Sequence, residues 1–316
     1  MSPGKVLVIG CGVSGLSCAL RLIEHGFEVE VWARDLPPHT TSNVAAALWY
    51  PYHAAPPERV DAWALTSYEV FRGLARDPET GVMLRSGVGI YPPGIEPPAC
   101  LRGLPGFRAA EPGELPAGKP RGYVVEAPVV EMPIYLGFLV AELRRRGGVI
   151  VERRCESLGS ALAAFERVVH CAGLGAREIA RDASVVPLRG QIVRTERCGV
   201  ERFVLDDFGA DGITYVVPRS NDCILGGTVE EGRESLEADE STTLEILARC
   251  RALEPRLEQA KLLGANVGLR PGRPEVRLEA EPFASGRLVV HNYGHGGAGV
   301  TLSWGCADEV CELVRA

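Results

Sequence analysis

The sequence contains very little lysine. Of its 34 basic side chains only Lys5, Lys119 and Lys261 are lysines, and the others are arginines. Acidic residues outnumber basic ones, 41 to 34, which gives a formal net charge of −7. A chain without an excess of positive charge has no basic field to attract phosphates. We therefore expect neither a nucleic acid nor an anionic membrane as a partner.

Long apolar runs are also missing. No stretch approaches the length of about 20 apolar residues that spans a bilayer. The N-terminus lacks the basic-then-apolar pattern of a secretory signal, because Val6 to Ile9 already has the composition of a buried strand. The last residues, 314–316 (VRA), do not form a peroxisomal Ser-Lys-Leu tail. We expect a cytoplasmic protein without a membrane anchor.

The ten cysteines show no CxxC spacing and no disulfide framework. Cys11, Cys18 and Cys171 lie in apolar stretches, where small buried thiols are common. This usage indicates a reducing compartment and excludes a zinc knuckle.

What the sequence does contain is a βαβ pattern at its start. Residues 5–9 (KVLVI) predict a buried strand, 14–25 an apolar helix and 27–35 a second strand. Between the first strand and the helix, Gly10, Gly12 and Gly15 fit the GxGxxG fingerprint of dinucleotide-binding folds. The first glycine permits the tight turn, the second lets a pyrophosphate approach the backbone, and the third lets helix pack on strand. The positive end of the helix would then face the phosphates.

The end of the second strand carries the residue expected to hold the adenosine ribose. An acidic residue usually bonds the ribose hydroxyls there, and Asp35 occupies that place. Because Arg34 lies next to Asp35, a second interpretation is that this segment binds the ribose 2′-phosphate of NADP. A surface Arg–Asp pair without a ligand is the third interpretation.

The rest of the 316-residue chain has room for a second unit with its own core. Helical periodicity predicts helices over 58–76, 134–146 and 239–253. Turn residues separate the β-rich segments 190–196, 213–219 and 223–230, which is typical of an antiparallel sheet.

We predict an α/β protein in which a Rossmann-like nucleotide-binding domain is interleaved with a substrate-binding domain. The substrate domain would be built on a large, mainly antiparallel sheet. We assign 1–54, 134–186 and 286–316 to the nucleotide domain, and 55–133 and 187–285 to the substrate domain.

Two polar residues on the predicted sheet are candidates for binding a ligand. Arg270 follows the apolar residues 267–269, and arginine can clamp a carboxylate with two parallel hydrogen bonds. A surface ion pair is the competing interpretation. Tyr215 lies in the middle of a predicted strand, where tyrosines usually pack their rings and send the hydroxyl to solvent.

The segment 291–305 (HNYGHGGAGVTLSWG) combines histidines with a glycine-rich loop. His291 and His295 have no carboxylate or cysteine beside them on the same element, so we expect no metal. A structural role for both histidines is the better interpretation. The glycines lead into a helical pattern that begins near Val300. Free backbone amides and a positive helix end at this point favour an electron-rich ligand.

Taken together, these segments resemble the D-amino-acid oxidase family of FAD flavoproteins, over essentially the whole chain. The resemblance rests on motifs that recur in order: VLVIGCGVSGLSCAL (6–20), TTSNVAAALWYPY (40–52), RGQIV (189–193), TYVVP (214–218), LGGT (225–228), VGLRPGRPEVRLE (267–279) and VVHNYGHGGAGVTLSWGCA (289–307).

The resemblance implies roles for individual residues. Arg270 and Tyr215 would bind the substrate α-carboxylate, the carbonyl of Gly297 would receive the amino group, and Tyr50 would touch the side chain. The implied FAD-binding residues are Gly10, Cys11, Gly12, Val13, Ser14, Gly15, Arg34, Asp35, Thr41, Ser42, Ala46, Ala47, Leu48, Cys155, Ala172, Gly296, Gly297, Gly299 and Thr301.

The implied reaction is oxidation of a D-amino acid by hydride transfer from Cα to the flavin N5. Dioxygen would be reduced to hydrogen peroxide, and the imino acid would hydrolyse to a 2-oxo acid and ammonia. The alternatives are a D-aspartate oxidase, a glycine- or sarcosine-type amine oxidase, a flavin-binding protein without turnover and, last, an NAD(P) dehydrogenase. A homodimer is the assembly that we consider.

The sequence departs from family patterns in the predicted pocket. The segment FGADGITY (208–215) is short and has no second tyrosine, which predicts an abbreviated lid. The positions where a D-aspartate oxidase would carry extra arginines hold Leu205 and Val229. An acidic side chain there would lose its hydration without compensation, so we predict neutral, apolar D-amino acids as substrates. Arg219 could still reach the pocket by another route.

Overall fold

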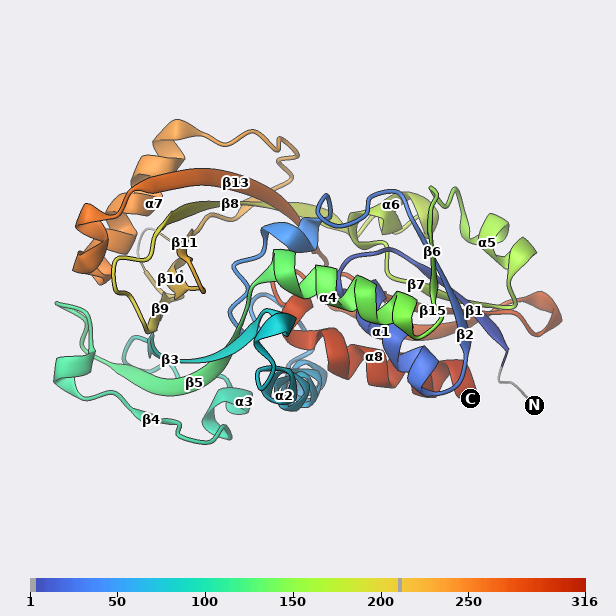
Figure 1. Ribbon diagram of the computed structural model, residues 1–316, viewed down its shortest axis with the longest axis horizontal. Coiled ribbons are helices and arrows are strands. Elements are labelled where there is room, and N and C mark those ends of the chain that lie inside the picture. The colour runs from blue at the N-terminus through green and yellow to red at the C-terminus, as the bar shows by residue number, and fades with distance from the viewer. Residues whose placement is uncertain (1–3, 210–211) are drawn as a thin grey trace.

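The computed structural model describes residues 4–209 and 212–316, which form two β-sheets lying side by side (Figure 1). The first sheet has six strands in the order β14–β15–β7–β1–β2–β6. Its strands are β1 (Lys5–Ile9), β2 (Glu28–Ala33), β6 (Val149–Glu152), β7 (Arg167–His170), β14 (Arg277–Pro282) and β15 (Leu288–Tyr293). All neighbours in it are parallel except β14 and β15, which form an antiparallel hairpin.

Strand β1 is buried on both faces, which explains its unbroken apolar sequence. Val6 and Val8 pack in the cluster that contains α1 (Val13–Glu24) and α8 (Gly299–Arg315). Leu7 and Ile9 point to the opposite face and pack with α5 (Leu158–Ala164). Helices on both faces of a mostly parallel sheet are the arrangement that the βαβ pattern predicts.

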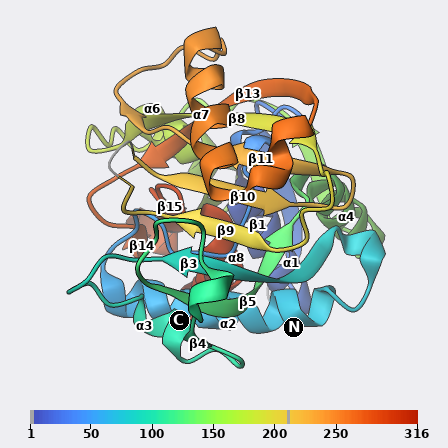
Figure 2. The ribbon, with the colours of Figure 1, turned by 90° about the vertical axis from the view of Figure 1, so that its left-hand side faces the viewer.

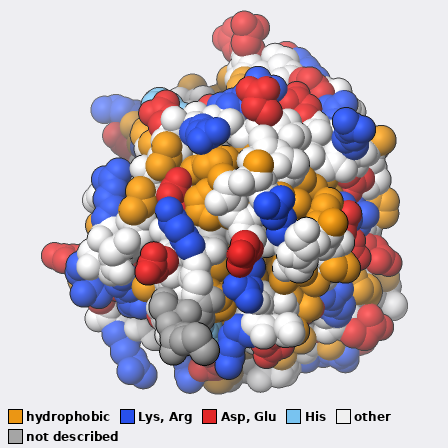
Figure 3. Space-filling view, turned by 90° about the vertical axis from the view of Figure 1, so that its right-hand side faces the viewer, with side chains coloured by type: hydrophobic (Ala, Val, Ile, Leu, Met, Phe, Trp, Pro, Cys, Tyr) orange, Lys and Arg blue, Asp and Glu red, His pale blue; other side chains and the backbone are white. Residues whose placement is uncertain are grey.

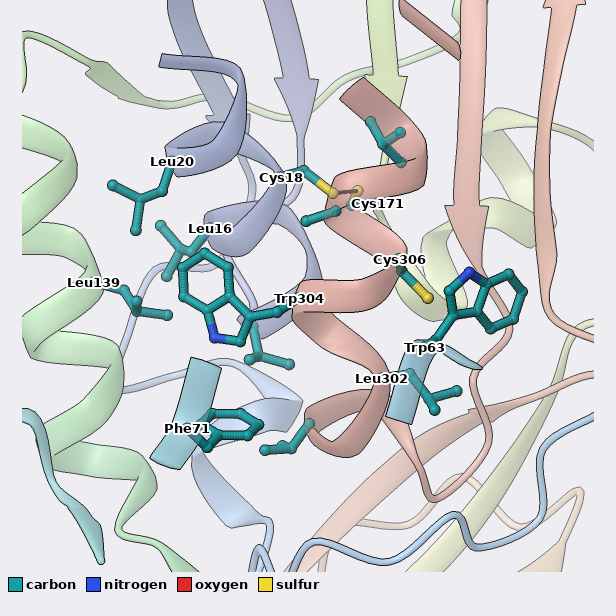
Figure 4. Close-up of a cluster of buried hydrophobic side chains, with 14 of the residues drawn as sticks. Leu16, Cys18, Leu20, Trp63, Phe71, Leu139, Cys171, Leu302, Trp304 and Cys306 are labelled. Carbon is teal, nitrogen blue, oxygen red and sulfur yellow. Dashed lines mark hydrogen bonds between the residues drawn. The ribbon is translucent and has the colours of Figure 1, made fainter. Parts of the chain in front are cut away.

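Helix α8 runs through the largest core (Figure 4). Trp304 lies among Leu16 of α1, Phe71 of α2 (Pro57–Leu74) and Leu139 of α4 (Met132–Arg145). Its indole Nε1 donates to the Tyr135 hydroxyl over 2.8 Å, so this buried donor is satisfied. Side chains from three other helices therefore pack around Trp304 in α8, the helix that follows the glycine-rich segment.

The second sheet has nine strands and lies beside the first (Figure 1). Its order is β12–β8–β11–β10–β9–β3–β5–β4, with β13 also paired to β8. The strands are β3 (Val82–Ile90), β4 (Arg108–Ala109), β5 (Gly122–Val130), β8 (Val186–Glu196), β9 (Phe203–Asp206), β10 (Thr214–Pro218), β11 (Asp222–Gly226), β12 (Glu230–Glu231) and β13 (Leu262–Gly272). Every pair is antiparallel except β3 with β9.

Alternation along these strands gives the sheet two different faces. Val193 and Val216 pack under α7 (Glu240–Leu253), which lies across the outer face (Figure 2). Their neighbours Ile192 and Tyr215 point to the inner face, toward the first sheet. This inner face becomes one wall of the cavity described below. The remaining helices are the short α3 (Ala99–Arg102) and α6 (Ala176–Ile179).

The α/β class and the large antiparallel sheet agree with the sequence prediction. The division into nucleotide and substrate domains stays a prediction. Strand β14 does not follow the predicted division. It falls within 187–285, which we assign to the substrate domain, but it pairs with β15 in the six-stranded sheet. The two strands of this hairpin therefore come from both assigned ranges.

Acidic and basic side chains alternate over the face shown in Figure 3, and neither sign forms a continuous field there. Among the described residues, no helix is long and apolar enough to cross a membrane. All ten cysteines are free thiols, and only Cys198 is not buried.

Candidate functional site

A cavity of about 490 Å³ lies between the two sheets. The ends of β1 and β2 and the start of α1 line one part of it. Strands β8, β10 and β13 and the start of α8 line another. Parallel strands of an open α/β sheet bind ligands at their carboxyl ends, so the cavity occupies the expected position.

The glycines of the first turn are required by the backbone around them. Gly10 has φ +113°, and a Cβ there would lie 2.4 Å from the carbonyl oxygen of Cys171. A Cβ on Gly15 would lie only 2.0 Å from the Gly10 carbonyl oxygen, so glycine is needed where α1 approaches the turn after β1. Gly10 and Gly12 line the cavity, whereas Gly15 does not. The amide of Val13 donates to Ser42 Oγ over 3.1 Å, which ties the segment 41–48 to the start of α1.

The end of β2 presents both candidate ribose ligands to the cavity. Arg34 and Asp35 line it, and Arg34 Nε donates to Asp35 Oδ2 over 2.8 Å. This hydrogen bond raises the pKa of Arg34. Both side chains are exposed, so a ribose hydroxyl can approach the Asp35 carboxylate.

The glycine-rich loop before α8 forms the cavity floor. Gly296 has φ +54°, and a Cβ there would lie 2.2 Å from the carbonyl oxygen of His53. A Cβ on Gly297 would meet the ring of Tyr52 at 2.5 Å. Gly297 is exposed between the buried Gly296 and Ala298, so its backbone is open to a ligand. The absence of side chains at Gly296 and Gly297 therefore permits close packing within the chain, and it also leaves the backbone of Gly297 open to a ligand.

The hydroxyl of Thr301 is engaged within the protein. It donates to the Tyr50 carbonyl over 3.0 Å and accepts from the Tyr50 amide over 3.1 Å. The first amides of α8 have no partner inside the helix, and the first three residues of α8, Gly299, Val300 and Thr301, line the cavity. Thr301 would therefore offer a cofactor its amide rather than its side-chain donor.

The histidines of this segment take part in buried networks. His291 Nδ1 lies 3.2 Å from His170 Nδ1, and its Nε2 lies 2.8 Å from Glu281. His295 Nε2 lies 2.9 Å from Asn292 Oδ1, and burial lowers the pKa of His295 to about 4. Over residues 4–209 and 212–316, no cluster of three or more His, Cys, Asp or Glu side chains is arranged to hold a metal ion.

Arg270 lies flat on the backbone of β8. A Cβ on Gly190 would lie 2.1 Å from its Nη1, so only glycine leaves room for the guanidinium. Nη1 also donates to the carbonyl of Thr228 over 3.1 Å. In the described part of the chain, no carboxylate oxygen lies within the 4.0 Å ion-pair distance of Arg270. A guanidinium in a cavity without an internal counter-ion is suited to bind an anionic ligand.

Tyr215 lies beside Arg270 on the same inner face. Its ring covers Gly226, where a Cβ would lie 1.9 Å from Cζ. Burial raises the pKa of the Tyr215 hydroxyl, and the charge of Arg270 opposes this rise. The hydroxyl is thus a neutral hydrogen-bond donor next to the cation. Sequence reasoning missed Gly190, Gly226 and Thr228, although the motifs RGQIV and LGGT contain them.

Apolar and aromatic side chains complete this end of the cavity. Tyr50, Leu205 and Ile213 line it, as do Tyr52, Ile192 and Leu236. Val229 is 39% exposed and does not belong to the lining. Arg219 is also absent from it, because its Nε and Nη2 bind Asp222 at 2.7 and 2.6 Å. The predicted short lid, 208–215, includes 210–211, which lie outside the described residues.

With the exception of Gly15, every predicted site residue lines this one cavity. The predicted substrate residues there are Tyr50, Tyr215, Arg270 and Gly297. The predicted cofactor residues there are Gly10, Cys11, Gly12, Val13, Ser14, Arg34, Asp35, Thr41, Ser42, Ala46, Ala47, Leu48, Cys155, Ala172, Gly296, Gly297, Gly299 and Thr301. Their individual roles stay predictions.

Comparison with known proteins extends this picture. Residues 5–313 match a protein family described as FAD dependent oxidoreductase (DAO). A D-amino-acid oxidase from Rubrobacter xylanophilus is 54% identical over 315 residues, covering 99% of this chain and 96% of the relative. The D-aspartate oxidase from Homo sapiens is 36% identical, covering 99% and 95%. The crystal structure of glycine oxidase from Geobacillus kaustophilus superimposes with a TM-score of 0.82 at 20% identity, covering 98% and 94%. At that identity the structural match shows a shared fold.

Proposed function

The chain belongs to the DAO family of FAD-dependent oxidoreductases, and on that premise we propose that it is a D-amino-acid oxidase. The substrate Cα–H and amino group give up two electrons and two protons to form an imino acid, and dioxygen takes up the electrons and protons to become hydrogen peroxide. Water then converts the imino acid to a 2-oxo acid and ammonia.

The observation that carries the proposal is the uncompensated cation in the cavity. Arg270 is held by Gly190 and the Thr228 carbonyl and keeps donors for a carboxylate. Tyr215 adds a neutral hydroxyl donor at the same place. A guanidinium binds a carboxylate with two parallel hydrogen bonds, which fixes its orientation as well as its position.

The residues of the cavity fit FAD. The start of α1, with Gly10 and Gly12, offers backbone amides for the pyrophosphate, and Asp35 offers a carboxylate for the ribose. The start of α8, with Gly299 and Thr301, would lie at the flavin ring, where the positive helix end stabilises negative charge. When bound, FAD accepts the hydride equivalent from the substrate and returns the electrons to dioxygen.

The protein's own contribution is orientation. Two anchor points, the Arg270–Tyr215 pair and the carbonyl of Gly297, would hold the carboxylate and the amino group of a substrate. With both fixed, only one enantiomer directs its Cα–H at a given face of the cavity. No side chain is required as a general base in this scheme. The apolar side chains of Leu205 and Ile213 line the cavity and would limit the access of water to the reacting carbon.

The pocket disfavours acidic side chains. Leu205 lines it where a D-aspartate oxidase would need an arginine, and Arg219 is already paired with Asp222. A second carboxylate in the substrate would lose its hydration without gaining a partner. Neutral D-amino acids are therefore the primary substrate class. A glycine-oxidase activity has no separate observation in its favour beyond the shared fold.

A substrate panel on FAD-loaded protein tests this function. D-Valine, D-methionine and D-aspartate are supplied with dioxygen, and hydrogen peroxide and 2-oxo acid are measured, with the L-enantiomers as controls. Peroxide from neutral D-amino acids supports the proposal, whereas preference for D-aspartate would replace it with D-aspartate oxidase. Anaerobic addition of D-valine should bleach the flavin absorbance. A flavin that stays oxidised with every D-amino acid would indicate a binding protein without turnover.

The cytoplasmic location, the homodimer and the two-domain division remain parts of this proposal. Ten free thiols are consistent with a reducing compartment.

A further inference from the structure

Asp207 lies in the turn directly after β9 (Phe203–Asp206), next to residues that line the cavity. Leu205, two residues earlier on β9, lines the cavity, whereas Asp207 is not itself one of the lining residues. The hydroxyl of Tyr50, a lining residue, donates to Asp207 Oδ2 over 3.1 Å. Asp207 is half-buried, so it is neither fully solvated nor sealed in the core.

No cation of the protein neutralises this carboxylate. Among the described residues, no lysine, arginine or histidine nitrogen lies within the 4.0 Å ion-pair distance of Asp207. The adjacent Asp206 shows the contrast, because its Oδ2 binds Lys119 Nζ at 2.7 Å. Charged and titratable groups that face Asp207 are His53, Tyr50, Tyr52, Tyr123 and Asp206. Of these only His53 can carry a positive charge, and it is exposed.

The charges of Asp207 and Arg270 act on the same part of the cavity. Both charges shift the pKa of the hydroxyl of Tyr52, a lining residue. Burial makes the largest contribution to its raised pKa, Asp207 raises this pKa further and Arg270 lowers it. Arg270 therefore places a cation in the cavity lining, and Asp207 places a carboxylate one hydrogen bond beyond it, on the lining residue Tyr50. A substrate with a cationic side chain matches both charges.

We propose that Asp207 is a specificity residue that receives the positively charged side chain of basic D-amino acids such as D-arginine and D-lysine. This inference rests on the proposed oxidase function and extends its substrate range. Tyr50 acts with Asp207, because it lines the cavity and its hydroxyl holds the carboxylate by a hydrogen bond. The same carboxylate repels the second carboxylate of D-glutamate or D-aspartate.

The test compares substrates that differ in charge but not in shape. D-Arginine is paired with D-citrulline, and D-lysine with D-2-aminoheptanoate, on FAD-loaded protein, with kcat/KM from peroxide release. Asp207→Asn keeps an oxygen acceptor for Tyr50 and removes the charge. The matched control is Glu245→Gln, which makes the same charge change on the exposed face of α7.

We expect wild-type kcat/KM to be at least about 10-fold higher for D-arginine than for D-citrulline. Asp207→Asn should bring this ratio close to one, leave D-citrulline within about 3-fold and raise the activity with D-glutamate. Glu245→Gln should leave every ratio unchanged. A wild-type ratio near one, or a ratio that survives in Asp207→Asn, overturns the inference. The wild-type comparison decides the matter if the variant does not fold.

The proposed oxidase function and the role of Asp207 fail in different ways. If no D-amino acid, D-valine and D-methionine included, yields peroxide, the proposed function fails and this inference with it. If neutral D-amino acids are oxidised but basic ones gain nothing from Asp207, only the inference fails.

Discussion

Tyr215 and Gly226 face each other across the antiparallel pair β10–β11, and the phenol ring occupies the place of the missing side chain. A Cβ on Gly226 would lie 1.9 Å from the Cζ of Tyr215 and 2.2 Å from its hydroxyl oxygen. The ring is wide and held on a strand, so it could not yield by a small side-chain rotation. The position of the Tyr215 hydroxyl in the cavity thus depends on a glycine in another strand.

Gly226→Ala should therefore displace Tyr215 and weaken substrate binding. We expect KM for a neutral D-amino acid to rise about 10-fold, the loss typical of one hydrogen bond to a charged group. Tyr215→Phe, which removes the hydroxyl and keeps the ring, should give a loss of similar size. Steady-state kinetics and the FAD absorbance spectrum provide the measurement. Unchanged KM in Gly226→Ala would show that the hydroxyl does not contact the substrate.

Arg270 is predicted to be the carboxylate clamp. Arg270→Ala should lower kcat/KM by about 1000-fold, and Arg270→Lys by about 10- to 100-fold, because lysine cannot donate two parallel hydrogen bonds. Bound FAD should stay close to the wild-type amount, since the assigned cofactor residues lie elsewhere in the cavity. Arg72→Ala on the exposed face of α2 is the matched control. Retained turnover in Arg270→Ala would overturn the assignment of the site.

Local patterns in the sequence were sufficient for much of this structure. The βαβ start, the helices near 58–76 and 239–253 and the antiparallel strands follow from short-range periodicity and turns. That distant segments line one cavity could be predicted only from the resemblance to family motifs, because no local pattern places residue 270 beside residue 215. The role of Gly190 and Gly226 was missed, since their constraint comes from side chains in other strands.

Other features had no local signal at all. Asp207 follows a short strand and belongs to no motif, and its importance appears only when Tyr50 is placed opposite it. The membership of β14 in the six-stranded sheet depends on its pairing with β15 rather than on its own composition. Such long-range pairings are set by tertiary packing, which single-sequence patterns do not contain.

Two helical glycines should respond in opposite directions to alanine. Gly15 in α1 has no room for a Cβ, which would lie 2.0 Å from the Gly10 carbonyl oxygen. Gly15→Ala should lower the free energy of unfolding by about 1–3 kcal/mol, the usual cost of overpacking. Gly137 in α4 is exposed, and a Cβ there would have no neighbour within 4 Å, so Gly137→Ala should raise stability by up to about 1 kcal/mol. Denaturant unfolding of FAD-free protein measures both, and equal effects would contradict the packing argument.

Buried histidines should make the fold sensitive to mild acid. Burial lowers the pKa of His295 to about 4 and that of His170 to about 3, whereas an unfolded histidine titrates near 6.5. Below about pH 6.5 the unfolded chain therefore binds more protons than the native one, so stability falls as the pH falls toward the native pKa values. At pH 5 each histidine contributes a loss on the order of 2 kcal/mol relative to pH 7.5.

A substitution isolates the contribution of His295 from that of the carboxylates, which also titrate in acid. In His295→Gln, the difference in unfolding free energy between pH 7.5 and pH 5 should shrink by on the order of 2 kcal/mol, because the group that binds the extra proton is gone. His25→Gln is the matched control, since His25 is exposed and stands outside the core. Urea unfolding at both pH values supplies the four free energies needed for each variant pair. An identical pH dependence in wild type and His295→Gln would show that His295 is already accessible to protons in the native fold.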